Sequence, residues 1–313
     1  MNYTKKFDIF DIKSPYGFVE NIFDKLKFPE PRKYAFAVVH ESYSTFDDYY
    51  HLRDKGKNFN GGGTCKYESI KVKYGKSVFV FDCVSDYNMI SYILRTPDNY
   101  NCVVILISDN PKIAYIDNLN NYDGCVEKGL YYPHGGSLLL KVALTLLIQN
   151  QHKLGISRVQ LRDVSFKKCY DRTNKRKPNI RLGDMLFLIQ NDTWYGRYGF
   201  KPYDSDKDVL DKNAYKSYLN NQKIISQTKI KDIKLYEYIH DAVKQLKLDF
   251  NLKDMKEYIE RNKEMYITEF FKKFMSAYDK LCVVFEQIYS KIFDDLDLRS
   301  FHGMSFYLDL PKL

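Results

Sequence analysis

Hydrophobic positions follow two different spacings along the chain. In the first two-thirds, short runs rich in valine and isoleucine stand between turn residues, which is the pattern of strands. Helices are predicted over 86–95, which Pro97 would end, and over 135–154, which Gly155 would end. The expected strands are 77–83, 102–108, 112–119 and 156–165.

The last third of the chain has a helical pattern instead. Neither glycine nor proline occurs between Pro202 and Gly303, and because both residues interrupt helices, their absence marks a change that we place near residue 205. The longest expected helix has one apolar face, which either packs in a helical bundle or on the first part of the chain, or docks a protein partner. The helices are expected at 231–247, 252–262 and 264–294.

The end of the chain returns to strand spacing. Phe306, Leu308 and Leu310 alternate with polar or amphipathic neighbours after Gly303. The helices are therefore expected to be inserted before a final strand.

Together these elements predict an α+β fold with a mixed, largely antiparallel sheet that is flanked by helices, and a further all-helical C-terminal part. The predicted division of the chain has four parts. These are an N-terminal segment of unclear role at 1–76 packed on the core, a core at 77–205, a helical region at 206–302 and a final strand within 303–313.

Composition excludes several classes of protein. The chain has 313 residues, of which 44% are hydrophobic and 28% charged, so it can form a real core and is not wholly disordered. No apolar run approaches the ~18 residues that span a membrane, and charges stand where a signal peptide needs an apolar stretch. We therefore expect no membrane partner and a cytoplasmic location.

Cysteines and histidines, six of each, give no sign of a metal site. No Cys-x-x-Cys occurs, and no cysteine stands at zinc-site spacing from a histidine. We therefore expect no metal and reduced thiols in a cytosolic setting, several of them in the core. The cysteines are Cys65, Cys83, Cys102, Cys125, Cys169 and Cys282.

The net charge of +9 favours acidic partners without identifying nucleic acid. Much of it is concentrated in the segment 167–181, where Asp171 is the one acidic residue. Three interpretations stay open: a solvated loop, a clamp on phosphates or an acidic substrate, and a nucleic-acid contact. The basic residues are Lys167, Lys168, Arg172, Lys175, Arg176, Lys177 and Arg181.

A glycine pair stands where a loop turns into a helix. The segment reads Tyr132-Pro-His134-Gly135-Gly136-Ser137, and glycine lets backbone N–H groups approach a ligand closely. The first turn of a helix leaves N–H donors unpaired, and the helix dipole favours an anion there. The pair is therefore either a phosphate-binding helix start or a plain turn.

The order of segments after this loop resembles the GNAT superfamily of acyl-CoA N-acyltransferases. The glycine pair opens a helix, a strand follows, and an apolar helix at 182–190 then leads to Tyr195-Gly-Arg-Tyr198-Gly199-Phe200. That last segment is similar to the family's Tyr-x-x-x-Gly-Phe. The resemblance covers roughly residues 77–205, and it is to divergent members of the kind seen in large DNA viruses or protists.

The resemblance implies a GNAT-like sheet, a cofactor site and a tyrosine acid. The loop and helix start would hold the pyrophosphate of acetyl-CoA, and the strand after the helix would splay from its neighbour to admit the pantetheine arm. Tyr195 would protonate the departing CoA thiolate, with Tyr198 as the alternative acid, and Glu127 is the candidate general base. The cofactor-binding residues would be His134, Gly135, Gly136, Ser137 and Leu138.

The sequence departs from the family in two respects. The loop lacks the family's basic residue, and the stretch between Ser165 and Tyr195 is longer than is common. The expected function is transfer of an acetyl group from acetyl-CoA to an amine on a small molecule or a protein. The alternative is a catalytically inactive protein of the same fold. It would bind through the segment 167–181 and the helices, in a viral nucleoprotein or particle within the host cytoplasm or virion.

Overall fold

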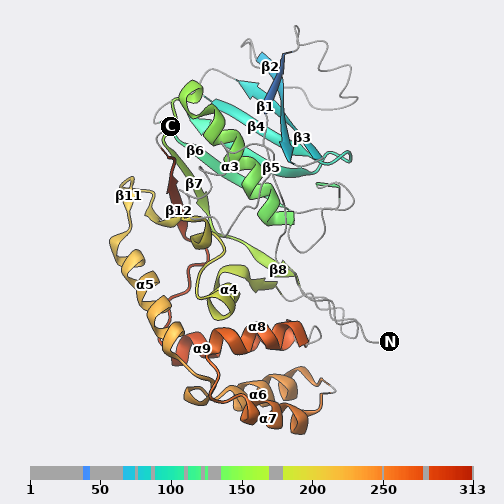
Figure 1. Ribbon diagram of the computed structural model, residues 1–313, viewed down its shortest axis with the longest axis vertical. Helices are drawn as coiled ribbons and strands as arrows, with labels where there is room; N and C mark the ends of the chain where they lie inside the picture. The colour runs from blue at the N-terminus through green and yellow to red at the C-terminus, as the bar shows by residue number, and fades with distance from the viewer. Residues whose placement is uncertain are drawn as a thin grey trace. The chain divides into compact units, whose positions relative to one another are not determined.

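The computed structural model shows an α+β protein with a large, mostly antiparallel sheet, and seven α-helices lie in the residues that it describes (Figure 1). The fold class predicted from the sequence is confirmed at this level. The chain divides into two compact units, Met1–Leu161 with Tyr307–Leu313, and Arg162–Phe306. The described residues are 38–42, 66–74, 77–85, 89–108, 112–120, 124–125, 135–168, 179–248, 250–277 and 282–311.

The first unit is built on strands that pair in chain order. They are β1 (Val38–Ser42), β2 (Lys66–Tyr74), β3 (Ser77–Ser85), β4 (Met89–Arg95), β5 (Asn101–Ser108), β6 (Ala114–Leu119) and β7 (Arg158–Arg162). Each strand from β1 to β6 is antiparallel to the next, whereas β6 and β7 are parallel. Helix α3 (Gly135–Leu154) connects β6 to β7 and contacts β2, β5 and β6 (Figure 1).

The side chains of strand β3 show that one face of the sheet is buried and the other is exposed. Phe79 and Phe81 are buried, whereas Val78 and Val80 are 40% and 42% exposed. Successive side chains of a strand point to opposite faces, so this alternation separates a covered face from an open one. Helix α3 is apolar almost all round its described part, and the described residues between Leu138 and Ile148 are buried except Lys141, as expected for a core helix.

The helix expected at 86–95 is wrong, because this part of the chain contains strand β4. Tyr92 and Leu94, two residues apart, are both buried. Strand β4 pairs with β3 on one side and β5 on the other. The short apolar segment fits the spacing of a helix and that of a strand equally well, and its hydrogen bonds to two neighbouring strands make it a strand.

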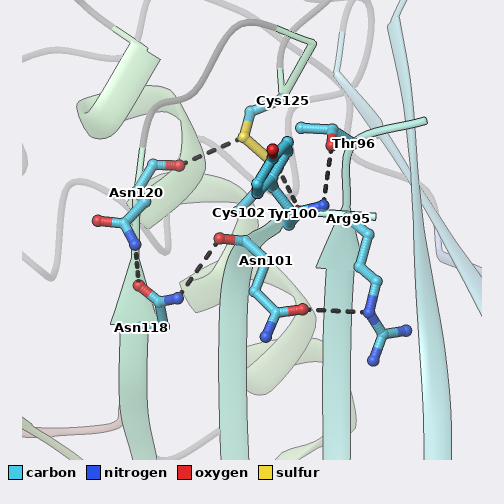
Figure 2. The surroundings of a disulfide bond; sticks show 8 residues. All are labelled: Arg95, Thr96, Tyr100, Asn101, Cys102, Asn118, Asn120 and Cys125. Carbon is cyan, nitrogen blue, oxygen red and sulfur yellow. Dashed lines mark hydrogen bonds between the residues drawn. A yellow bond between two sulfur atoms is a disulfide. The ribbon is translucent and has the colours of Figure 1, made fainter. Parts of the chain in front are cut away.

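A disulfide joins Cys102 to Cys125, so the expectation of reduced thiols is wrong for this pair (Figure 2). The antiparallel register explains why the two meet: Val103 lies opposite Leu119, and Asn120 N–H donates to the Cys102 carbonyl at 2.8 Å. The chain that leaves β6 thus passes beside the start of β5. Since disulfides belong mostly to oxidising compartments, the thiols no longer support a cytosolic setting.

The described residues of the second unit form two short strand pairs and the helical region. Its elements are β8 (Phe166–Lys168), β9 (Asn179–Arg181), α4 (Leu182–Gln190), η1 (Gly196–Tyr198), β10 (Lys201–Asp204), β11 (Val209–Leu210), α5 (Lys212–Gln227), η2 (Ile230–Asp232), α6 (Leu235–Leu246), α7 (Leu252–Arg261), α8 (Ile267–Ala277) and α9 (Cys282–Asp295). Strand β12 (Ser305–Asp309) follows them, which confirms a helical region inserted before a final strand. The change in composition near residue 205 lies within this unit.

The predicted apolar face at 264–294 is buried, and it is divided between α8 and α9, whose connection at 278–281 lies outside the described residues. Phe271 of α8 and Phe285 of α9 meet edge to face at 5.5 Å. Helix α8 packs on α4 and α5, and α9 packs on α6 and α4. The described part of this face therefore belongs to the core and is not a docking surface for a protein partner. Its fully buried residues are Ile267, Phe270, Phe271, Phe274, Phe285, Ile288 and Ile292.

Across the described ranges, none of the helices has the length and the apolar character that crossing a membrane requires. The same ranges contain no cluster of three or more His, Cys, Asp or Glu side chains that could hold a metal ion.

Candidate functional site

The start of helix α3 is a candidate site within the first unit. The helix begins at Gly135; Gly136 and Ser137 are half-buried and Leu138 is buried. No acidic residue stands in its first turn. The first turn of a helix carries N–H groups without intrahelical partners, and the dipole of a 20-residue helix favours an anion at this end. Two other predicted site residues, Glu127 and His134, lie outside the described residues.

The parallel pairing of β6 and β7 ends before strand β6 does. It joins Ala114 to Val159 and stops at Ile116 and Leu161, although β6 continues to Leu119. On the other side of β6, Val104 pairs with Asn118 and Ile105 pairs with Ile116, which leaves Asp117 as an extra residue. Asp117 thus forms a β-bulge at the point where the parallel pairing ends, and bulges end pairing or redirect side chains beside active sites.

These two features meet at one edge of the sheet. In a strand–helix–strand unit the helix returns antiparallel to its strands, so it begins at the edge where the strands end. Ligands of sheets with parallel strands bind at this edge, in the crevice outside the carboxyl ends of the strands. The start of α3 and the bulge at Asp117 therefore belong to the same edge, and the arrangement can take an elongated anionic ligand.

The tyrosine segment belongs to the second unit and is a candidate site of its own. Gly199 has φ +86, a left-handed conformation that closes the turn around Tyr195. The Tyr195 side chain is 6% exposed, and its ring centroid lies 4.7 Å from that of Trp194 and 5.9 Å from that of Phe200. The sequence motif gave the positions of the tyrosine and the glycine, and the structure shows the turn between them.

Tyr198, the alternative acid, is fully buried. Its hydroxyl accepts a hydrogen bond from Arg197 Nη2 at 2.9 Å, and the same guanidinium lies 4.9 Å from its ring centroid. A phenol in this setting is a core residue. Tyr195 is buried too, with 6% of its surface exposed.

The carboxyl group of Asp192 lies beside this turn and was not predicted from the sequence. Asp192 follows α4, and its Oδ1 accepts a hydrogen bond from the Tyr218 hydroxyl of α5. Burial raises the pKa of Asp192 to about 6, although the bonds from Tyr218 and from the Thr193 backbone N–H act against the rise. Perturbed carboxyl groups are frequent near functional sites, but structural networks produce them too.

Two further carboxyl groups are buried in the second unit. Asp163 and Asp184 are 0% and 1% exposed. Burial raises the pKa of Asp184 to about 6, against the hydroxyl of Ser300 and the charge of Arg181, and burial also raises the pKa of Asp163. The Asp163 carbonyl accepts a hydrogen bond from Gly303 N–H at 2.6 Å. The segment that leads to β12 thus bonds to the Asp184 carboxyl through Ser300 and to the Asp163 backbone carbonyl through Gly303, and we assign both residues a structural role.

Replacing Asp184 by asparagine is expected to stabilise the protein at pH 8 by about 1–2 kcal/mol. A raised folded-state pKa means that the fold disfavours the ionised carboxyl and favours the neutral one. The stability that the neutral carboxyl contributes is complete below pH 3.8 and is lost as pH rises through about 6. Asparagine keeps an acceptor for Ser300 without the charge. Urea unfolding at pH 5 and 8 measures the effect.

Wild type should be relatively more stable at pH 5, and Asp184→Asn should reduce this difference. The exposed Asp206 offers a matched control, because Asp206→Asn also removes one negative charge. An equal change in both variants would contradict the role of burial.

Comparisons of the chain with protein-family models, with curated proteins and with solved structures found no match.

Proposed function

We propose that the protein is an N-acetyltransferase that transfers the acetyl group of acetyl-CoA to an amine. The observation that carries the proposal is the end of the parallel pairing at Ile116 and Leu161, beside the bulge at Asp117. It lies at the edge where a glycine-opened helix begins. The resemblance to GNAT enzymes requires two parallel strands to separate next to such a helix, to admit the pantetheine arm. Here β6 continues to Leu119 beyond its last pairing with β7, which itself ends at Arg162.

The chemistry assigned to the residues is direct attack. The amine attacks the thioester carbon and gives up a proton, for which Glu127 is the proposed base. The tetrahedral intermediate then expels the CoA thiolate, and Tyr195 protonates the sulfur or donates a hydrogen bond to it. The backbone N–H groups of Gly135 to Leu138 would stabilise the pyrophosphate without a basic side chain.

Acetyl-CoA and CoA are expected to raise the melting temperature by several degrees, and inorganic phosphate by much less. Saturation at 100 times Kd adds about 2.7 kcal/mol to stability, which corresponds to such a rise for a protein of this size. A thermal-shift titration measures it.

Ser137→Asp is the matched variant for this titration. A carboxylate in the first turn is favourable for the helix itself, so the variant should fold, but it repels a phosphate at the same place. Loss of the CoA-dependent rise in Ser137→Asp would support binding at the α3 start. An unchanged rise in the variant would move the cofactor elsewhere, and no rise in the folded wild type would contradict the proposed function.

Nucleic-acid binding is the second candidate, and the seven basic residues of the segment 167–181 favour it. The helical region at 206–302 is nearly balanced in charge, so the basic segment would carry such binding. Binding of a labelled oligonucleotide should then weaken steeply between 50 and 200 mM salt, as counterion release requires. Such binding, together with no CoA-dependent thermal shift, would favour a non-enzymatic role.

A further inference from the structure

The inserted helical region forms a hydrogen bond to the segment just before the turn that carries Tyr195. Tyr218 of α5 donates its hydroxyl hydrogen to Asp192 Oδ1, across 26 positions of sequence. Asp192 lies three residues before Tyr195, between the end of α4 and the turn. Helix α5 therefore makes a specific polar contact with the segment that the proposed function uses.

Gly196 shows how closely this hydrogen bond lies against the turn. A Cβ at Gly196 would come within 3.0 Å of three oxygens, those of Asp192 Oδ1, Tyr218 Oη and Thr193 Oγ1. The Gly196 N–H also donates to Thr193 Oγ1 at 2.8 Å. The backbone on the carboxyl side of Tyr195 thus rests directly on the bonded pair, so a change in the pair moves the tyrosine.

Tyr218 is itself fixed by its surroundings. Its ring lies edge to face with Phe187 at 5.6 Å and with Phe301 at 5.8 Å, and it stacks on Tyr215 at 6.0 Å. Gln222 Nε2 donates to its hydroxyl at 3.2 Å. Since the hydroxyl oxygen accepts from Gln222, its hydrogen is free to point at Asp192. The direction of the bond to the turn is therefore set by α5 and by the aromatic cluster.

The charged groups near Asp192 act in opposite directions. Burial raises its pKa, whereas the bonds from Tyr218 and Thr193 N–H and the positive charge of Arg197 lower it. Arg197 also donates to Gln190 Oε1 at 3.1 Å and so connects the turn to α4. On the α5 side, burial and then the neighbouring Asp192 and Tyr215 raise the pKa of the Tyr218 phenol, so Tyr218 stays a donor. The carboxyl of Asp192 therefore changes charge near pH 6 while its donor does not.

We propose that Asp192 and Tyr218 are positioning residues for Tyr195, and that helix α5 presents the tyrosine to the substrate through their hydrogen bond. The catalytic half of this inference rests on the proposed function, whereas the structural half does not. It gives the inserted helices a role in setting the site, rather than in docking a partner.

Trp194 provides a test that needs no substrate. It is the one tryptophan of the chain, it is 8% exposed, and its ring centroid lies 4.7 Å from that of Tyr195. Its emission should change between pH 7.5 and 5 with a midpoint near 6, the pKa of Asp192. Asp192→Asn should abolish this transition, and Tyr218→Phe should move its midpoint upward because a bond that lowers the pKa is lost.

Tyr215→Phe is the matched control. Tyr215 stacks on Tyr218, and the variant loses a hydroxyl on the same helix without touching the bond to Asp192. Its transition should match that of wild type. Circular dichroism and melting temperature establish that each variant folds. If Tyr218→Phe does not fold, Gln222→Leu serves as a second probe, because the loss of Gln222 removes its hydrogen bond to the Tyr218 hydroxyl. A pH transition of Trp194 that is the same in wild type, Asp192→Asn and Tyr218→Phe would overturn the proposal.

Kinetics test the catalytic half. Tyr218→Phe should lower kcat for acetyl transfer about tenfold with an unchanged KM for acetyl-CoA, because a displaced acid affects the reaction and not cofactor binding. A full kcat in Tyr218→Phe would overturn the positioning role. If wild type transfers no acetyl group, the proposed function fails, and the Trp194 titration still decides whether the pair holds the turn.

Discussion

Reduction of the Cys102–Cys125 disulfide is expected to lower the free energy of unfolding by about 3 kcal/mol. The bond closes a loop across 23 positions of sequence, and a cross-link of that span removes about this much conformational freedom from the unfolded chain. Cys102 and Cys125 are 0% and 4% exposed, so the folded state offers the bond little access to reductant. Urea unfolding with and without dithiothreitol measures the loss.

The surroundings of the disulfide indicate what its loss would release. A Cβ at Gly124, which has φ +90, would lie 3.5 Å from side-chain atoms of Thr96 and Pro97, and Asn120 N–H donates to the Cys102 carbonyl at 2.8 Å. Cys125 thus holds the chain after β6, which leads toward α3, against the start of β5. We expect reduction to loosen this segment first.

Cys125→Ala separates the disulfide from other effects of the reductant. The variant should resemble reduced wild type and should not respond further to dithiothreitol. Cys83, a buried cysteine outside this disulfide, serves as the reference for thiol counting by alkylation and mass spectrometry. Free thiols at both Cys102 and Cys125 in the untreated protein would contradict the prediction, as would an unfolding midpoint that is insensitive to reductant.

Tyr195→Phe is expected to lower kcat for acetyl transfer about 100-fold with little change in the KM for acetyl-CoA. General-acid assistance contributes about 10²–10⁴ to rate, and the hydroxyl is the only group that the substitution removes. The ring keeps its packing against Trp194, Phe200 and Phe306, so the variant should fold like wild type. Release of CoA with a panel of polyamines, amino sugars and lysine peptides measures turnover.

Tyr198→Phe is the matched control for this measurement. It also removes a phenolic hydroxyl, three residues after Tyr195. The Tyr198 ring is fully buried, and its oxygen accepts a hydrogen bond from Arg197. We expect a loss of stability of about 1 kcal/mol and a kcat close to that of wild type. Unchanged turnover in Tyr195→Phe would remove this residue from the mechanism, and a larger loss in Tyr198→Phe would transfer the role to Tyr198.

Elements with a long or strongly patterned apolar sequence were predicted well. Helices α3 and α4 begin and end where the sequence places them, and strands β3, β5 and β6 agree to within two residues. Helix α5 lies in the predicted helical region, but its bounds were not predicted. Its four buried residues form one narrow stripe among lysine, asparagine and serine, and one of these four residues is polar. Asn221 occupies that position and bonds to the backbone of Arg299. These buried residues are Ala214, Tyr218, Asn221 and Ile225.

By itself, the sequence determined the local features of the candidate site. Two glycines open α3, and Gly199 supplies the left-handed residue that ends the turn of Tyr195, because these conformations depend on neighbouring residues alone. Only the tertiary structure decided the disulfide, the bulge at Asp117 and the bond from Tyr218 to Asp192. Each of these depends on which distant segments pair, and strand register and helix packing establish those pairings only when the core assembles.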